Sequence, residues 1–188
     1  MYHPHQKGLS FVELLIVIAV AAILAAFAMP SLTDFLRNNR AVAQINDLQT
    51  SLNLARSEAI KRNTQVVICK SDNGTSCKDS GTAWQDGWIV FVDSNLDNQV
   101  TNASDIIQVH QGLDGGNTLV FTPTRVVYAS SGLATSGTTG TFVLCDSRGA
   151  NHAKGLIIGA SGRARLAQDG DDNGVVENYA SNDLSCSS

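Results

Sequence analysis

The sequence predicts an α+β protein in which one long N-terminal helix packs against an antiparallel β domain. Three observations lead to this prediction. A continuous apolar run occupies residues 14–29, and an amphipathic stretch with helical spacing follows it. Short β-type runs separated by Gly, Asn, Asp and Ser clusters fill the rest of the 188-residue chain. Roughly 125 residues follow the helix, which suits a single domain with its own core.

The apolar run is long enough to enter a membrane. Its 16 residues contain no polar side chain, and together with Phe11 and Val12 they approach the ~20 residues that cross a hydrocarbon core. One certain positive charge, Lys7, precedes the run, and no small-residue cleavage site follows it. This pattern disfavours an ordinary secretory signal peptide. The sequence therefore predicts a single-pass membrane helix.

Two residues stand out at the ends of this helix. Glu13 is an ionisable group beside the apolar run, where a charge costs a few kcal/mol or more, so it is a candidate functional residue that needs a cationic partner. The alternative is that Glu13 lies at headgroup level and is simply solvated. Pro30 lacks an N–H group and clashes with the carbonyl four residues back, so it is expected to kink the helix where it leaves the bilayer.

The helix is predicted to continue as an amphipathic segment to about Asn63. Apolar residues recur at spacings of 4, 3, 4, 3 and 4, at Ala41, Ile45, Leu48, Leu52, Ala55 and Ala59. The opposite face is polar and carries Arg37, Arg40, Asp47, Gln49, Asn53 and Arg56. One face must therefore lie on a partner, most simply the chain's own sheet, although the small alanines would equally permit packing on other helices.

The remaining chain contains eight predicted strands. They occupy residues 66–69, 88–92, 106–110, 118–121, 125–128, 142–145, 156–158 and 164–167. Between the fifth and sixth, residues 129–140 carry no charge and almost no large side chain. This composition predicts a mobile loop.

Four cysteines follow the apolar segment, which indicates two disulfides and an oxidising compartment. Three pairings are open. We favour Cys69 with Cys77, which closes a small loop, and Cys145 with Cys186, which ties the C-terminal end to a strand. A zinc site is disfavoured, because no Cys-x-x-Cys pair exists and the histidines lack ligand spacing.

The start of the chain resembles the processing site of type IV prepilins and pseudopilins. A Lys7-Gly8 pair precedes the apolar run, and Glu13 is the fifth residue after the glycine. The resemblance implies that a prepilin peptidase removes residues 1–8, cleaving between Gly8 and Leu9, and methylates the new amino group of Leu9. Where this chain has Leu9, the family more often has Phe. The freed amine of a neighbouring subunit is then the cation that meets Glu13 and sets the register of a filament.

Five further blocks resemble the FimT/FimU minor pilins, relatives of the H-type pseudopilins of type II secretion. They are residues 51–63 (SLNLARSEAIKRN), 66–69 (VVIC), 87–93 (GWIVFVD), 144–149 (LCDSRG) and 162–165 (GRAR). The resemblance implies the type IV pilin fold. It divides the chain into a cleaved leader (1–8), a membrane helix with a Pro30 kink (9–36), an amphipathic helix (37–63) and a periplasmic β domain (64–188).

The function implied is structural. The chain is expected to be a minor pilin of the inner membrane that primes or joins a type IV pilus, at its tip or along the fibre, with other pilin subunits and the prepilin peptidase as partners. An H-type pseudopilin of a type II secretion system is an alternative. No catalytic elbow, phosphate loop, His-Glu-x-x-His or dinucleotide motif is present, so neither an enzyme nor a cofactor is expected.

The distribution of charged residues suggests a further alternative function, which is binding to nucleic acid. Beyond Asn63 the chain has 7 Lys or Arg and 13 Asp or Glu, a net of −6, which argues against a general affinity for nucleic acid. Yet five basic residues share a segment with a single acid, Asp146. They are Arg125, Arg148, Lys154, Arg163 and Arg165.

Within this segment the motif Gly162-Arg163-Ala164-Arg165 is singled out. On a strand, both arginines point to one side, and two guanidinium groups suit successive phosphates. In FimT-type pilins such a motif is associated with binding double-stranded DNA during uptake for transformation. The site predicted on this resemblance comprises Gly162, Arg163, Arg165, Lys154 and Arg148. Alternatively, the arginines pair with the acids that follow, at Asp169, Asp171, Asp172 and Glu177.

Two acidic loops are weighed as calcium sites. Residues 169–174 match the start of an EF-hand loop, with Asp169, Asp171 and Asn173 as ligands, and residues 93–98 match it more loosely. Both lack the closing glutamate, because the twelfth positions are Ala180 and Ser104. Such clusters more commonly form Asx turns in exposed hairpins, so no metal is predicted.

Overall fold

A single helix dominates the N-terminal part of the chain. The computed structural model describes residues 10–186, and helix α1 runs from Phe11 to Arg62, 52 residues. The chain divides into two compact units, Met1–Asn39 and Arg40–Ser188. Pro30 lies inside α1, so this proline does not end the helix. The kink expected at Pro30 stays a prediction. Among the described residues, α1 is the one helix long and apolar enough to cross a membrane.

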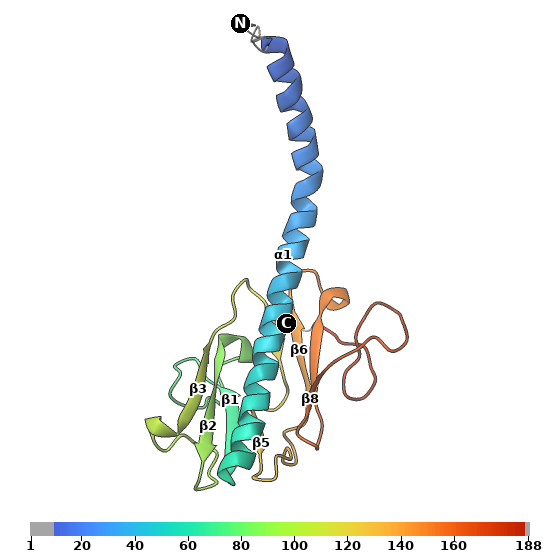
Figure 1. Cartoon of the computed structure of the whole chain (residues 1–188). Helices are drawn as coiled ribbons and strands as arrows, with labels where there is room; N and C mark the ends of the chain where they lie inside the picture. Colours follow the sequence, from blue (N-terminus) through green and yellow to red (C-terminus); the bar gives the residue numbers. More distant parts are fainter. Residues whose placement is uncertain (1–9, 187–188) are drawn as a thin grey trace, which may run out of the picture. The chain divides into compact units, whose positions relative to one another are not determined.

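The second unit contains two four-stranded antiparallel sheets (Figure 1). Sheet A has the order β3-β2-β1-β5, and sheet B has the order β4-β6-β7-β8. The strands of sheet A are β1 (Gln65–Lys70), β2 (Gly87–Asp93), β3 (Ile106–Gln111) and β5 (Arg125–Tyr128). Those of sheet B are β4 (Thr118–Val120), β6 (Gly140–Cys145), β7 (Lys154–Ile158) and β8 (Ala164–Leu166). Each coincides with a predicted run to within two residues, which confirms the α+β class.

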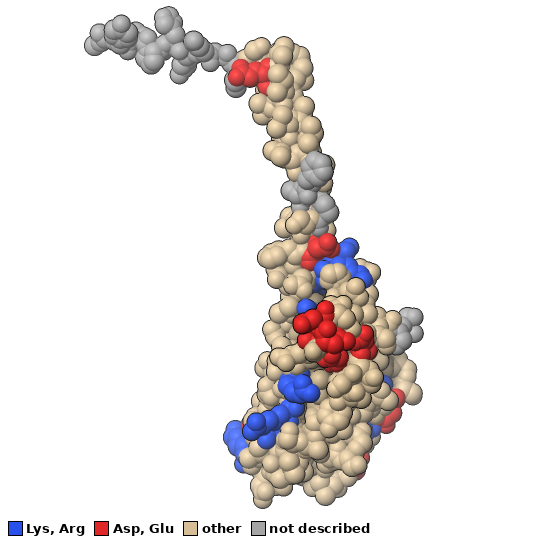
Figure 2. All heavy atoms as spheres, turned by 90° about the vertical axis from the view of Figure 1, so that its right-hand side faces the viewer, with Lys and Arg blue, Asp and Glu red and all other residues tan. Residues whose placement is uncertain are grey.

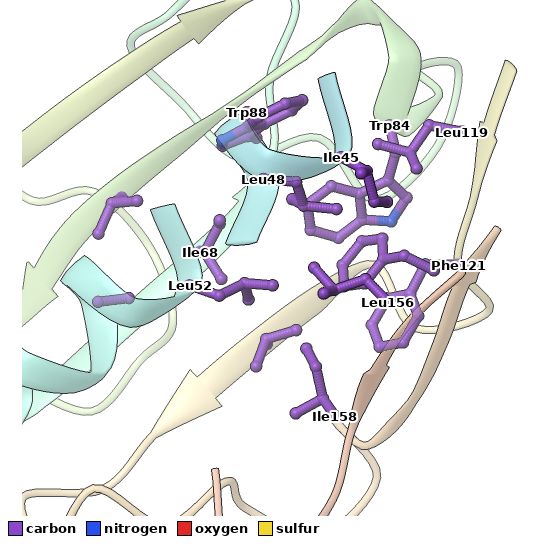
Figure 3. Packing of buried hydrophobic residues seen from close by; sticks show 14 of the residues in the cluster. Ile45, Leu48, Leu52, Ile68, Trp84, Trp88, Leu119, Phe121, Leu156 and Ile158 are labelled. Atoms are coloured by element: carbon purple, nitrogen blue, oxygen red, sulfur yellow. The ribbon is translucent and has the colours of Figure 1, made fainter. Parts of the chain in front are cut away.

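The apolar stripe of α1 packs on the chain's own sheets. All six stripe residues, from Ala41 to Ala59, are at most 3% exposed. They form one cluster with buried residues of both sheets, and Figure 3 shows Leu48 and Leu52 in this cluster with Trp84 and Leu156. Because the stripe faces both sheets, the prediction that it packs on the chain's own β domain is confirmed.

Buried polar side chains also hold α1 in place. The indole N–H of Trp88 donates to Ser51 Oγ at 3.0 Å, and both residues are fully buried. Gln44 donates to the carbonyl of Asp114 at 2.8 Å and accepts a hydrogen bond from Asn117 at 2.7 Å. Periodicity of apolar residues does not reveal these contacts, because the polar residues lie on the same face as the stripe.

Both predicted disulfides are present, Cys69–Cys77 and Cys145–Cys186. The second ties the C-terminal tail, residues 168–186, to strand β6. Beside this bond, Leu184 packs with Cys145 and Ala153 in a small cluster of its own. The tail therefore covers part of sheet B rather than extending into solvent.

The segment 129–140 corrects an expectation. It was predicted to be a mobile loop, but its backbone is hydrogen bonded to β5 and to the turn after β7. Thr135 N–H donates to the carbonyl of Val127 at 2.9 Å, and Ala134 N–H donates to that of Ala160 at 3.2 Å. Ala134 is also part of the core cluster. Small uncharged residues here allow close backbone packing, which the composition alone does not distinguish from flexibility.

Candidate functional site

The Gly-Arg-Ala-Arg motif lies at the start of edge strand β8. Gly162 is buried and adopts φ +72°, a conformation that favours glycine. A methyl group on it would lie 2.2 Å from the carbonyl oxygen of Gly132, so only glycine fits this turn. Arg163 directly precedes β8, and Arg165 within it pairs with Ile157 of β7. Both arginines are exposed, and their two-residue spacing places them on one face.

The side chains of Arg163 and Arg165 form no ion pair or hydrogen bond within residues 10–186. The alternative that they pair with the following acids is therefore not observed there. Those acids bind their own loop instead. Glu177 accepts from Gly170 N–H at 2.9 Å, and Asp169 accepts from Gly174 N–H at 2.8 Å. On the side of the β domain that carries β8, acidic side chains gather in one patch and a group of Lys and Arg side chains lies apart from it (Figure 2).

Two other arginines of the predicted basic segment, Arg148 and Arg125, form ion pairs with aspartates of the β domain. Arg148 binds the carboxylate of Asp146 with an Nη2–Oδ2 distance of 2.6 Å, and the two side chains are 12% and 4% exposed. The hydrogen bond from Arg148 lowers the pKa of Asp146 below its usual value. Arg125 pairs with Asp79 and donates to the carbonyl of Asn98. This engagement argues against the predicted contribution of Arg148 to a DNA-binding surface.

Lys154 lies on the other face of sheet B. It shares the core-facing side of β7 with Leu156 and Ile158, because these residues are two and four positions away, whereas Arg165 is paired with Ile157 on the opposite side. Lys154 lines a small apolar groove together with Val42 of α1. The predicted five-residue site is thus divided, and Arg163 and Arg165 with Gly162 remain as one surface.

Arg56, which was predicted only to lie on the polar face of the helix, contacts the β domain. Its Nε donates to the carbonyl of Gly132 at 2.9 Å, the same oxygen that closely faces Gly162. Seven residues earlier, Gln49 donates to the carbonyl of Ala164 in β8 at 3.4 Å. One face of α1 therefore runs beside the motif. No sequence signal links Arg56 to Gly132, because 76 positions separate them.

The acidic loop at residues 169–174 does not present as one set the three calcium ligands that were weighed, Asp169, Asp171 and Asn173. Carboxylate oxygens of Asp169, Asp171 and Glu177 lie within 4.8 Å of one another. Asn173, in contrast, directs its amide N–H₂ toward Asp183 at 3.0 Å, and its Oδ1 accepts from Val175 N–H at 2.8 Å. The loop satisfies its own polar groups in this way, which favours the Asx-turn interpretation.

The second acidic loop is also self-satisfied. Asp93 is 1% exposed. Its carboxylate accepts hydrogen bonds from Asn98 N–H at 2.9 Å and from the side chain of Gln65 at 2.6 Å. Asp93 thus orders the turn after β2, as an Asx-turn residue does.

The assembly site is described in part. Glu13 lies in the first turn of α1, and the described side chains from Phe11 to Met29 are exposed in the first unit. So large an apolar surface requires a membrane or other helices to cover it. Gly8 and Leu9 lie outside the described residues, so the cleavage site and the contact between Glu13 and the amine of Leu9 stay predictions.

A helix with an exposed apolar N-terminal half, followed by two antiparallel sheets bound to its C-terminal half, defines a pilin-like subunit. Residues 44–162 match the family described as type II transport protein GspH, and the chain belongs to this family. Residues 3–29 match the prokaryotic N-terminal methylation motif. The family is structural, and it implies contacts with other pilin subunits and with the prepilin peptidase.

Individual relatives agree with this assignment. The pilin-like protein PilA1 of Thermus thermophilus is 27% identical over 169 residues, covering 86% of this chain and 98% of PilA1. The crystal structure of the type IV minor pilin FimU of Pseudomonas aeruginosa has a similar fold, with a TM-score of 0.56 at 19% identity, over 71% of this chain and 92% of FimU. The predicted type IV pilin fold and the resemblance to minor pilins and pseudopilins are confirmed.

Proposed function

We propose that this protein is a minor pilin of a type IV pilus, inserted in the inner membrane by the apolar half of α1 and processed after Gly8 before it primes or joins the fibre. The observation that carries the proposal is an acid, Glu13, in the first turn of α1, beside the exposed apolar run 14–29 and within the residues that match the methylation motif. The names of PilA1 and FimU favour a pilus, whereas the family name GspH keeps secretion as the alternative.

The role of Glu13 follows from electrostatics. A carboxylate moved into hydrocarbon loses its hydration, which costs several kcal/mol unless a cation is close. The amino group that cleavage would expose on Leu9 of a neighbouring subunit is such a cation. Subunits whose amine meets Glu13 are stabilised over those in any other register. The pair therefore selects one helix–helix register.

A test replaces Glu13 by glutamine, which keeps the shape and removes the charge. We expect leader removal to be retained, while the amount of protein in sheared fibres falls at least tenfold. Immunoblots of membrane and fibre fractions measure both. Asp34→Asn, the same charge change further along α1, serves as the control. Equal incorporation of Glu13→Gln and wild type would contradict the proposed role, and recovery only with secretion complexes would favour the pseudopilin alternative.

A second candidate function, DNA capture, is favoured by one observation. Arg163 and Arg165 are exposed at an edge strand without a carboxylate partner in the described residues. Free guanidinium groups bind phosphate in a sequence-independent manner. In gel shifts of the full chain in detergent at low salt, we expect duplex DNA to bind wild type, and the double variant Arg163→Ala/Arg165→Ala to lose most of that binding. Absence of binding by the wild type would exclude this function.

A further inference from the structure

The carbonyl oxygen of Gly132 brings two distant parts of the chain together. Arg56 of α1 donates to it through Nε at 2.9 Å. Gly162, one residue before Arg163, approaches the same oxygen so closely that a methyl group would lie 2.2 Å from it. The side chain of Arg56 and the start of the motif are therefore adjacent, although α1 and β8 lie far apart in sequence.

The orientation of α1 supports this adjacency. Gln49 and Arg56 are seven residues apart, so they lie on the same face of the helix. Gln49 donates to the carbonyl of Ala164, between the two arginines of the motif. Both contacts point toward the β8 side of the domain, where basic side chains gather (Figure 2). The face of α1 that carries Arg56 thus runs along the β8 edge of sheet B, next to the start of the motif.

Arg56 has binding capacity left over. The described bond uses Nε alone, and its two Nη groups form no hydrogen bond or ion pair within residues 10–186. The nearest acid along the helix, Glu58, is already bound to Lys61 at 3.2 Å and to Arg62 at 2.6 Å. A guanidinium fixed at Nε presents its remaining N–H groups in a constrained direction, which suits an oxyanion.

A buried, neutral side chain lies beside the turn that carries Arg163. The ring of Tyr128 lies 3.1 Å from the position that a methyl group on Gly162 would take. Its hydroxyl is buried without a hydrogen-bond partner in the described residues. Burial raises the pKa of Tyr128, so this side chain stays neutral. The Tyr128 hydroxyl therefore adds no negative charge beside the guanidinium groups.

We propose that Arg56 is a third phosphate-binding residue, and that α1 and β8 together form one site for the backbone of duplex DNA. The inference rests on the DNA-binding function proposed above. It adds a residue from the helix to the two of the motif. It also gives segment 129–140 a role, since the Gly132 carbonyl holds Arg56 beside the turn that carries Arg163.

The test measures DNA affinity against salt concentration for the full chain in detergent. Arg56→Gln removes the charge but keeps an N–H donor for the Gly132 carbonyl. We expect affinity to fall about tenfold near 0.1 M salt, and the slope of log K against log salt to decrease by about one, as for the loss of one phosphate contact. Arg56→Lys should recover most of the affinity. Unfolding temperatures of these variants should match the wild type.

Arg40→Gln is the matched control, because Arg40 belongs to the same helix but lies against the Gly115 turn. An equal loss in Arg40→Gln would show a general charge effect and overturn the inference. Normal binding by Arg56→Gln, with loss in the Arg163→Ala/Arg165→Ala double variant, would overturn the role of Arg56 alone. No binding by wild type would overturn both this inference and the DNA function.

Discussion

The stability lost when a glycine of this protein is replaced depends on the atoms that surround it. Gly162 and Gly137 both have positive φ, +72° and +78°. Gly137 has no atom near its missing side chain, whereas Gly162 faces the Gly132 carbonyl, the Tyr128 ring and the backbone nitrogen of Ala134. Both are costly to replace because of their backbone conformation, but only Gly162 is also held by its neighbours.

Gly162→Ala should therefore be far more destabilising than Gly137→Ala. For Gly137→Ala we expect about 1–2 kcal/mol from the left-handed backbone alone. For Gly162→Ala the clash with the Gly132 carbonyl adds to this, and we expect a total of about 3 kcal/mol or more. Thermal unfolding followed by tryptophan fluorescence measures both. Similar losses in the two variants would show that the turn relaxes freely.

The buried pair Asp146–Arg148 predicts a pH effect. Because the folded-state pKa of Asp146 is below the usual 3.8, its contribution to stability is full above that value and is lost as the pH falls through the folded pKa. Asp146→Asn should thus be less stable than wild type near neutral pH, and should lose less stability on acidification to about pH 3.

Chemical unfolding across that pH range measures the difference between Asp146→Asn and wild type. Asp72→Asn is the control, since the side chains of the Asp72–Lys78 ion pair are 46% and 41% exposed and exposed pairs contribute little. A constant difference at every pH would contradict the coupling.

At the level of elements, α1 combines two kinds of helix. Up to Asn39 it belongs to a unit whose described apolar side chains are exposed. From Arg40 it supplies the stripe that joins the two sheets. The second half also carries buried polar residues that fix its position along the sheets, such as Ser51 beside Trp88. Apolar burial stabilises this packing, while such hydrogen bonds select one register.

Ser51→Ala tests this role. The substitution leaves the indole N–H of Trp88 buried without its partner, which costs about 1–3 kcal/mol. We expect a lower unfolding temperature and a change in the fluorescence of Trp88. Ser57→Ala is the control, because the hydroxyl of Ser57 bonds only locally to the Leu54 carbonyl on the exposed face. Equal stability of the two variants would mean that water or another group replaces Ser51.

At the level of the whole molecule, the two units require different surroundings. The second unit, Arg40–Ser188, contains both sheets, both disulfides and the core clusters. The first unit has a long apolar surface and no core among its described residues. The proposed minor pilin function accounts for this division, because such a subunit would be held in a membrane before it joins a fibre.

A chain beginning at Arg40 should accordingly remain monodisperse without detergent, whereas the full chain should need detergent. Its unfolding temperature should stay within a few degrees of the full chain, because the stripe from Ala41 onward is kept. Light scattering coupled to size exclusion, together with thermal unfolding, measures these properties. Aggregation of the shortened chain would show that residues before Arg40 cover part of the β domain.

The sequence by itself determined the secondary structure and the family. Apolar periodicity is a local property, so it located α1 and all eight strands, and the prepilin motif is read within a few residues. The number of cysteines and the loops they close led to the correct pairing among three.

Only the tertiary structure decided the order of the strands, the folding of segment 129–140 onto β5, and the different surroundings of the arginines. Arg148, Arg163 and Arg165 look equivalent in sequence, yet one is paired with a buried acid and two are exposed. Arg56 reaches Gly132 across 76 positions. Such contacts depend on the packing of elements distant in the chain, and the spacing of residues along one element carries no information about them.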